Sequence, residues 1–199
     1  MQAEASEAFT PYELGLLQSI GIERERPFEP DARMRELLSE GVLIGDAMAK
    51  ANAYANRLPG VRRYPDRMYE HLFLGGRHDF MRGEALWLDA RTLFHYEAIV
   101  VTPAMALERV GFGSQYLASY RDADGEFLMG QHSYKLHLPP NPPAKDFWAV
   151  TMYDTQTRSQ LQTDQQFPTL GSQDKGIMKN ADGSYDIYFA PKTPEGQEG

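Results

Sequence analysis

The sequence predicts an α+β fold, with a helical N-terminal portion over residues 1–109 packed on an antiparallel β-sandwich over residues 110–199. Apolar residues recur at helical spacing between residues 31 and 57. After residue 113, short segments alternate between apolar and polar side chains, as strands with one buried face do. Two Asp-Gly dipeptides, Asp124-Gly125 and Asp182-Gly183, lie between such segments. They favour tight hairpin turns, because glycine reaches positive φ without steric cost.

The composition is that of a globular protein. The chain has 199 residues, of which 42% are hydrophobic and 24% charged, and a chain of this length buries roughly 70% of its unfolded surface. The formal net charge of −8 opposes phosphate backbones and anionic membrane surfaces, so we expect no nucleic-acid partner. Cysteine is absent, which excludes disulfides and thiol chemistry. No apolar run is long enough for a membrane span, and the N-terminal residues lack the pattern of a signal peptide.

Capping residues place the expected helices. Thr10-Pro11 predicts a short helix that ends at Gly21, and Asp31 caps a longer one that runs to about Arg57. Glycines and prolines between residues 58 and 83 predict a structured connection. Residues 84–101 then predict a helix buried on two sides, with His95 hydrogen-bonded inside, and a helical turn follows at residues 104–109.

Four segments of the second half are expected to form strands. Residues 114–120 and 132–138 alternate in polarity and are expected to pair across Asp124-Gly125. Residues 147–153 carry apolar or aromatic side chains on both faces, which predicts an interior strand. Residues 176–179 and 184–189 flank Asp182-Gly183 and predict a second hairpin.

The second half resembles a known family. Its residues 147–173, FWAVTMYDTQTRSQLQTDQQFPTLGSQ, and 179–198, KNADGSYDIYFAPKTPEGQE, closely resemble the family catalogued as domain of unknown function 1214. The helical first half resembles the end of the partner family, domain of unknown function 1254. The resemblance implies a jelly-roll-like sandwich in a bacterial protein that is often exported, hence periplasmic or secreted. It implies neither an activity nor catalytic residues.

The family pattern continues into further strands beyond the point where this sequence stops, at Gly199. The last eight residues are polar and rich in turn formers, so no further strand is expected from them. A sandwich without its last strands exposes unpaired edge groups. We therefore expect the N-terminal helices, a second copy or another chain to cover this edge, with a homo-oligomer favoured.

The strongest candidate site lies where the strand at residues 147–153 ends. Tyr153, Asp154, Thr157 and Arg158 bring a phenol, a carboxylate, a hydroxyl and a guanidinium together, and Trp148 offers a stacking surface. An Asp154–Arg158 pair can bind a ligand, or it can simply lock the loop.

Other motifs are weak. The five histidines lack the spacing of a metal pair, and Ser114 lacks the Gly-x-Ser-x-Gly pattern of a nucleophile. Asp122 and Asp124 fit a turn better than a calcium loop. The sequence therefore predicts neither a metal nor a cofactor.

Three functions remain open. The leading hypothesis is an exported or envelope-associated accessory protein that binds a small molecule or carbohydrate in the sandwich. The first alternative is a hydrolase or lyase that acts through Asp154, Arg158 and a tyrosine. The second is a structural interaction module without a small-molecule site. A cavity with a third titratable group beside Asp154 and Arg158 would favour the enzyme, and an aromatic cavity would favour the binding protein.

Overall fold

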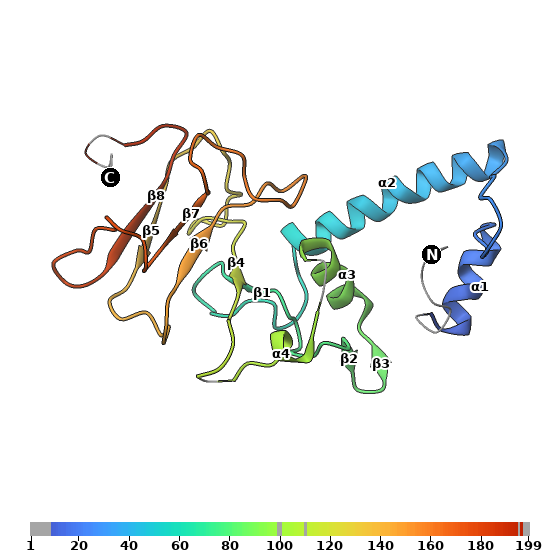
Figure 1. Cartoon of the computed structure of the whole chain (residues 1–199), viewed down its shortest axis with the longest axis horizontal. Coiled ribbons are helices and arrows are strands. Elements are labelled where there is room, and N and C mark those ends of the chain that lie inside the picture. The colour runs from blue at the N-terminus through green and yellow to red at the C-terminus, as the bar shows by residue number, and fades with distance from the viewer. Residues whose placement is uncertain (1–8, 99–100, 110, 195, 197–199) are drawn as a thin grey trace. The chain divides into compact units, whose positions relative to one another are not determined.

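The computed structural model describes residues 9–98, 101–109, 111–194 and 196. The chain forms two compact units, Met1–Ala51 and Asn52–Gly199. Helices and antiparallel strands are both present, so the chain is α+β (Figure 1). The predicted boundary at residues 109 and 110 marks a change from helical to strand patterns, and it stays a prediction. Val110 itself lies outside the described residues.

The first unit begins with helix α1, Pro11–Ser19, whose start is set by a capping box. The amide of Glu13 donates to Thr10 Oγ1 over 3.2 Å, and the amide of Thr10 donates to Glu13 Oε2 over 2.8 Å. The chain leaves the helix through Gly21 at φ 83°. The predicted start and end of this helix are confirmed.

Helix α2 spans Ala32–Tyr54 and crosses from the first unit into the second. Asp31 caps it, because its Oδ1 accepts from the amide of Met34 over 2.7 Å. The predicted helix is confirmed and ends slightly before Arg57. Its last turn supplies buried Ala53 and partly buried Tyr54 to the second unit.

The core of the second unit is built around helix α3, Leu88–Glu97. The ring of Phe94 lies 4.5 Å from that of Phe73 and 5.6 Å from that of Phe80, centroid to centroid. The buried core cluster consists of Val61, Leu74, Phe80, Ala90, Leu93 and Phe94.

The prediction for residues 84–101 is partly wrong. The chain first makes a tight hairpin of β2, Met81–Arg82, and β3, Ala85–Leu86, because Gly83 turns it at φ 63°. Helix α3 buries one face rather than two, and His95 is exposed with its Nδ1 2.9 Å from the Arg91 carbonyl oxygen. Residues 99 and 100 lie outside the described part. The predicted turn follows as α4, Pro103–Ala106.

Two short strands connect the helical and strand-rich parts of the second unit. Strand β1, Glu70–His71, pairs with β4, Leu117–Ala118, in antiparallel register. Residues 61–63 line the other edge of β1, where the amide of His71 donates to the Val61 carbonyl over 2.8 Å. We call β1 and β4 together the β1–β4 ribbon.

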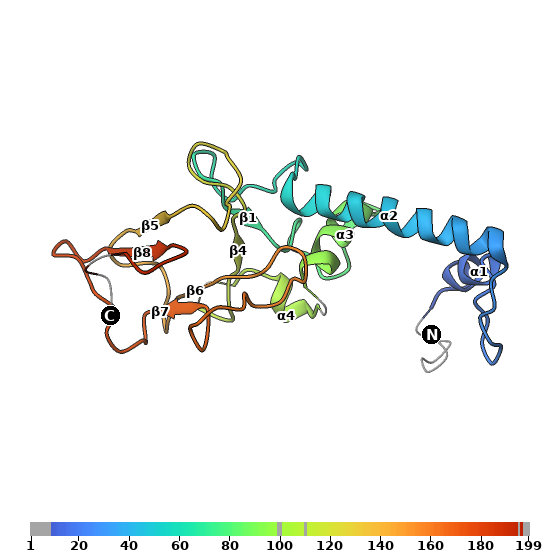
Figure 2. The same cartoon turned by 90° about the horizontal axis from the view of Figure 1, so that it is seen from above.

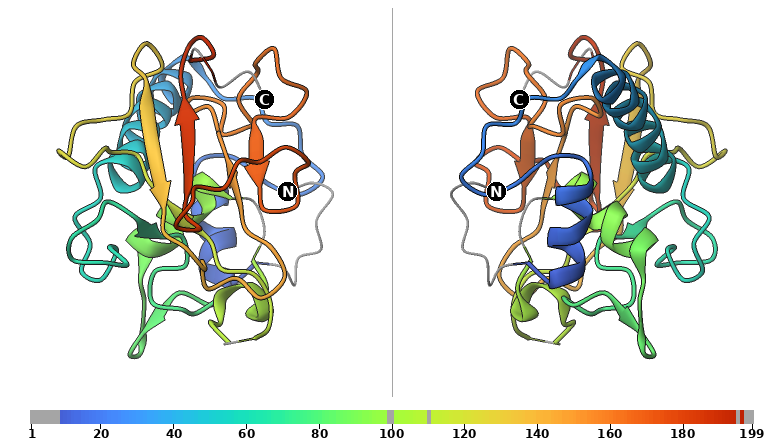
Figure 3. Two further views of the ribbon diagram at one scale, coloured as in Figure 1. Left: turned by 90° about the vertical axis from the view of Figure 1, so that its left-hand side faces the viewer. Right: turned by 90° about the vertical axis from the view of Figure 1, so that its right-hand side faces the viewer.

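Two further antiparallel pairs occupy the C-terminal part. Strand β5, Tyr134–Leu138, pairs with β8, Tyr185–Phe189, and β6, Ala149–Thr151, pairs with β7, Thr169–Gly171. Figure 2 shows them as separate ribbons, and Figure 3 shows β5 and β8 side by side. The ring of Trp148, just before β6, meets that of Tyr185 edge to face with centroids 5.0 Å apart. The antiparallel strands are confirmed, and the jelly-roll arrangement stays a prediction.

The first predicted turn is confirmed, but its strand partners are not. Asp124-Gly125 forms the tip of a small hairpin, with Gly125 at φ 86° and Arg121 bridged to Phe127. Residues 114–120 and 132–138 do not pair with each other, because β4 pairs with β1 and β5 pairs with β8.

At the second turn, the amide of Asn180 donates to the Ser184 carbonyl over 2.9 Å, and Gly183 lies at φ 89°. The predicted pairing of residues 176–179 with 184–189 is wrong. Strand β8 instead takes β5 as its partner, where Asp186 lies opposite His137 with their side chains 2.7 Å apart. On β5 the side chains of Lys135 and His137 both contact Asp186, at 3.5 and 2.7 Å.

The strand at residues 147–153 is shorter than predicted. Only Ala149–Thr151 forms β6, and Phe147 and Tyr153 at its flanks are each 57% exposed. The prediction of a strand buried on both faces is therefore wrong. Among the described residues β6 pairs with β7 alone, so this segment is not the interior strand that its apolar side chains predicted.

Candidate functional site

The expected Asp154–Arg158 side-chain pair does not form. Asp154 closes its own loop, because its Oδ1 accepts from the amides of Gln156 and Thr157, over 2.9 and 2.7 Å, and from the Thr157 hydroxyl over 3.0 Å. These bonds, chiefly those from Thr157, hold the pKa of Asp154 below its usual value. Asp154 and Thr157 thus stabilise the loop without the side chain of Arg158, which differs from the expected Asp154–Arg158 lock.

Arg158 lies elsewhere. Its guanidinium stands over the ring of Tyr96 on α3, 4.5 Å from the centroid. Trp148 packs on Tyr185, and Tyr153 is bridged to Gln160. The structure therefore does not gather the five predicted residues around one cavity, and their role in ligand binding stays a prediction.

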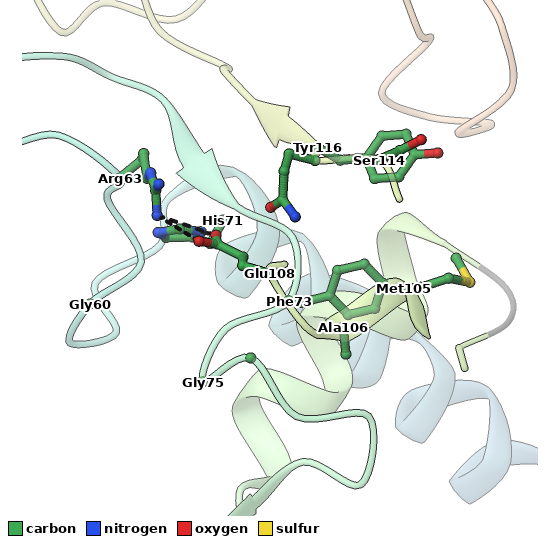
Figure 4. Close-up of a pocket in the computed structure, with 12 residues that line it drawn as sticks. Gly60, Arg63, His71, Phe73, Gly75, Met105, Ala106, Glu108, Ser114 and Tyr116 are labelled. Carbon is green, nitrogen blue, oxygen red and sulfur yellow. Dashed lines mark hydrogen bonds and ion pairs between the residues drawn. The ribbon is translucent and has the colours of Figure 1, made fainter. Parts of the chain in front are cut away.

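A cavity of about 370 Å³ opens at another place in the second unit, beside the β1–β4 ribbon (Figure 4). Its walls come from residues 60–76, from α4 and the residue that follows it closely, Glu108, and from residues just before β4. The lining residues are Gly60, Arg63, His71, Phe73, Gly75, Gly76, Met105, Ala106, Glu108, Ser114, Gln115 and Tyr116.

One wall of this cavity carries three titratable groups. Arg63 Nη1 lies 3.2 and 3.1 Å from the two carboxylate oxygens of Glu108, and His71 Nδ1 lies 3.7 Å from Glu108 Oε1. Burial and then the positive charge of Arg63 lower the pKa of His71, against the opposing effect of Glu108. His71 is therefore neutral at pH 7, and the charges of Arg63 and Glu108 cancel.

The rest of the lining combines free polar groups with an apolar surface. Figure 4 shows Phe73, Met105 and Ala106 grouped apart from Arg63, His71 and Glu108, with Tyr116 and Ser114 on a third side. The side chains of Ser114, Gln115 and Tyr116 make no hydrogen bond within the described part of the chain, and Tyr116 is 53% exposed. These groups remain available to a bound molecule.

A second group of polar residues lies on the other side of the β1–β4 ribbon. The hydroxyl of Tyr120 donates to Glu97 Oε1, and the ring of Tyr120 meets that of Tyr54 edge to face at 4.9 Å. The Tyr54 hydroxyl donates to the Thr155 carbonyl over 2.6 Å. Burial raises the pKa of Glu97 to about 7, and it also raises the pKa values of Tyr54 and Tyr120. We call Tyr54, Glu97 and Tyr120 the buried acid cluster.

Tyr96 connects Arg158 to this cluster. Its ring lies 5.9 Å from that of Tyr54, centroid to centroid. Its buried hydroxyl interacts electrostatically with that of Tyr54, but it makes no hydrogen bond of good geometry among the described residues. Of the predicted site residues, Arg158 is thus the one that reaches a cluster with perturbed acid groups.

Sequence reasoning missed both groups. Arg63, His71 and Glu108 are separated in the sequence, and no local spacing relates them. Glu97 follows the apolar face of α3 and reads as an ordinary helical carboxylate. A usable signal was present at Glu70-His71 alone, where two titratable residues stand next to each other in a short segment that forms a strand.

Residues 113–199 match the family described as "Protein of unknown function (DUF1214)". This confirms the resemblance of the second half, and the resemblance of the first half to the partner family stays a prediction. The match includes Ser114, Gln115 and Tyr116 of the cavity, whereas Arg63, His71 and Glu108 precede it. No curated protein matches the chain. Within the described residues, none of the helices is long and apolar enough to cross a membrane.

Proposed function

We propose that the second unit binds a small, neutral, polyhydroxylated molecule, a carbohydrate or a related polyol, in the cavity beside the β1–β4 ribbon. The observation that carries this proposal is the Arg63–Glu108 pair, which faces an open cavity of about 370 Å³. The volume lies within the range of small-molecule sites, roughly 300–1,000 Å³.

The charges of the cavity support a neutral ligand. Arg63 and Glu108 neutralise each other, and the lowered pKa of His71 keeps its imidazole uncharged at pH 7. A carboxylate or phosphate ligand bound to Arg63 would lie beside the carboxylate of Glu108, which is 3.1 Å from the same guanidinium, and the two anions would repel each other. A neutral ligand avoids this cost.

The hydrogen-bonding groups support hydroxyls as the ligand's polar groups. A hydroxyl both donates and accepts, and the cavity places the donor Arg63 next to the acceptor Glu108. Arg63 uses only Nη1 for Glu108, so its other guanidinium nitrogens are free of acceptors in the described chain. The exposed ring of Tyr116 and the apolar side chains of Phe73 and Met105 can contact the carbon faces of a sugar.

This proposal changes the place of the site but keeps the class of function. The cavity lies beside the β1–β4 ribbon rather than between the two C-terminal ribbons, and Trp148 packs on Tyr185 outside its lining. The jelly-roll-like arrangement and an exported or envelope-associated role, both implied by the family resemblance, remain part of the proposal. The side chains of Asp154 and Arg158 do not form the pair on which the hydrolase or lyase alternative drew, and that alternative stays a prediction.

Titration calorimetry and ¹H–¹⁵N spectra test the proposal with glucose, mannitol, acetate and inorganic phosphate as probes. We expect the neutral polyols to shift the amides of residues 114–116 and the anions to leave them unchanged. Glu108→Gln preserves shape but removes the charged acceptor, so we expect at least about tenfold weaker polyol binding. Asp79→Asn is the matched control, because Asp79 pairs with Arg77 2.5 Å away on the surface. Binding of the anions alone, or equal affinity for both variants, overturns the proposal.

A second candidate function is self-association through the C-terminal strands. Each C-terminal ribbon has two strands among the described residues, so the outer edge of β8 has no strand partner there. When two copies of β8 pair antiparallel about Ile187, Asp186 lies opposite Tyr188, so no like charges meet. The same pairing of two copies of β5 would place Lys135 opposite His137, which are both basic. We propose that a second copy of this chain pairs along β8. Light scattering over a dilution series tests this, and a monomer at all concentrations contradicts it.

A further inference from the structure

The carboxyl group of Glu97 lies buried without a charged partner. Its Oε1 accepts from the Tyr120 hydroxyl, whereas its Oε2 is buried and has no hydrogen-bond partner among residues that the structure describes. No cation of that part of the chain lies within ion-pair distance of it. An ionised carboxylate in this place loses its hydration without full compensation, so its surroundings favour the protonated form.

The titratable and charged groups of Glu97 and its neighbours come from four segments. Glu70 on β1 is a second carboxylate close enough to disfavour its charge, and Tyr120 follows β4. Tyr54 ends α2, and Arg158 stands over Tyr96 in the loop after β6. The positive charges of Arg62 and Arg121 act on Glu70.

Burial, reinforced by Glu70 and opposed by the hydrogen bond from Tyr120, raises the pKa of Glu97 to about 7. The pKa of Glu70 is also raised by burial, against Arg62 and Arg121. The raised pKa of Glu97 agrees with the burial of its carboxyl group, and a value of about 7 means that Glu97 loses its proton within the physiological pH range.

The β1–β4 ribbon connects this carboxyl group to the cavity. Successive residues of a strand point to opposite faces, so Glu70 faces the buried acid cluster and His71 faces the cavity. Glu70 is paired with Ala118, and His71 with Leu117. Tyr120 lies two residues beyond Ala118 and donates its hydroxyl to Glu97. Tyr116 lies one residue before Leu117 and lines the cavity.

We propose that Glu97 is a proton-controlled latch that regulates ligand binding in the cavity by holding or releasing the β1–β4 ribbon. While Glu97 is protonated, it accepts from Tyr120 and does not repel Glu70, and the ribbon stays closed. When Glu97 loses its proton, its carboxylate is charged and buried, and it moves toward water to regain hydration. This motion loosens the contacts of Tyr120 and Glu70 together. The cavity then loses the fixed positions of His71 and Tyr116. The regulatory role rests on the proposed function of the cavity.

The electrostatic field of Glu97 does not by itself explain how its ionisation would change ligand binding in the cavity. The charges that act on His71 are those of Arg63 and Glu108. An effect of Glu97 on the cavity must therefore travel through the ribbon, which makes the ribbon's own opening the appropriate measurement.

Amide hydrogen exchange of Glu70, His71, Leu117 and Ala118, corrected for intrinsic rates, measures this opening without any ligand. Between pH 6 and pH 8.5 we expect opening to become about tenfold more frequent in the unchanged protein, as proton linkage between a pKa near 7 and an ordinary carboxyl value requires. Glu97→Gln keeps an acceptor for Tyr120 and cannot ionise, so its ribbon should open equally at both pH values. Glu126→Gln, an exposed carboxylate in the 120–128 hairpin, is the control and should behave as the unchanged protein.

The ligand arm repeats the glucose titration at both pH values. We expect binding to weaken as the pH rises, and we expect Glu97→Gln to flatten this dependence. Opening that does not change with pH, or that changes equally in Glu97→Gln, overturns the latch. A third outcome is pH-dependent amide exchange as expected for the latch, in a protein that binds no polyol at either pH. That outcome overturns the proposed function alone and shows that the ribbon opens independently of it.

Discussion

The guanidinium of Arg158 lies 4.5 Å from the ring centroid of Tyr96, and its backbone is left-handed at φ 60°. A non-glycine residue in this region costs about 1 kcal/mol relative to glycine. The cation–π contact with Tyr96 stabilises the folded state by about 0.5–1 kcal/mol at a partly exposed site. The loop therefore holds Arg158 in an unfavourable backbone conformation that points its side chain at α3.

Replacing Arg158 separates these two effects. Arg158→Ala loses the contact with Tyr96 and keeps the strained backbone, so we expect a loss of about 1 kcal/mol in the free energy of unfolding. Arg158→Gly loses the same contact but relieves the strain, so it should be more stable than Arg158→Ala by about 1 kcal/mol. Denaturant unfolding of both variants measures the difference. An alanine variant at least as stable as the glycine variant contradicts the argument.

The second turn of the C-terminal part should be intolerant of side chains. Gly183 lies at φ 89°, and a Cβ added there would lie 3.4 Å from Pro140 Cβ. We expect Gly183→Val to destabilise the second unit by about 1 kcal/mol or more, because valine is branched and strained at positive φ. Gly130→Ala is the matched control, since its backbone is ordinary and open space surrounds it. Equal melting temperatures for the two variants would show that the turn is not constrained.

The stability of the second unit should fall as the pH rises through neutrality. The pKa of Glu97 is raised in the folded state from 4.5 to about 7, so folding favours the protonated form. Its contribution is fully present below pH 4.5 and is lost as the pH rises through 7, by up to about 3 kcal/mol. Thermal unfolding at pH 5 and pH 8 measures this. Glu97→Gln should reduce the dependence, and an unchanged dependence in that variant assigns it to other groups.

Local sequence signals predicted the features that are decided locally. Thr10, Pro11 and Asp31 marked the starts of α1 and α2, because a cap satisfies amides within the next turn of the same helix. Asp124-Gly125 likewise marked its turn, because positive φ is a property of a single residue.

The predictions that failed concern contacts between residues far apart in the sequence. Strand β8 follows its own turn closely, yet it pairs with β5, where Lys135 and His137 both meet Asp186. The Arg63–Glu108 pair and the Glu97–Tyr120 bond join segments that no spacing rule relates. Asp154 was read as a partner for Arg158, although carboxylates after a strand often bind the amides of their own loop, as this one does.

The contact between Trp148 and Tyr185 tests whether the two C-terminal ribbons form one packed layer pair. Trp148 precedes β6 and Tyr185 begins β8, and their rings meet edge to face at 5.0 Å. Such aromatic pairs contribute about 0.5–1.5 kcal/mol beyond their buried area. A double-mutant cycle of Trp148→Phe and Tyr185→Leu should therefore give a coupling energy in this range. Phe147, the exposed neighbour of Trp148, provides the control, because a cycle of Phe147→Leu with Tyr185→Leu should show almost none. Equal coupling in both cycles would mean that the ribbons do not pack through Trp148, and the sandwich would then need another contact to hold its halves together.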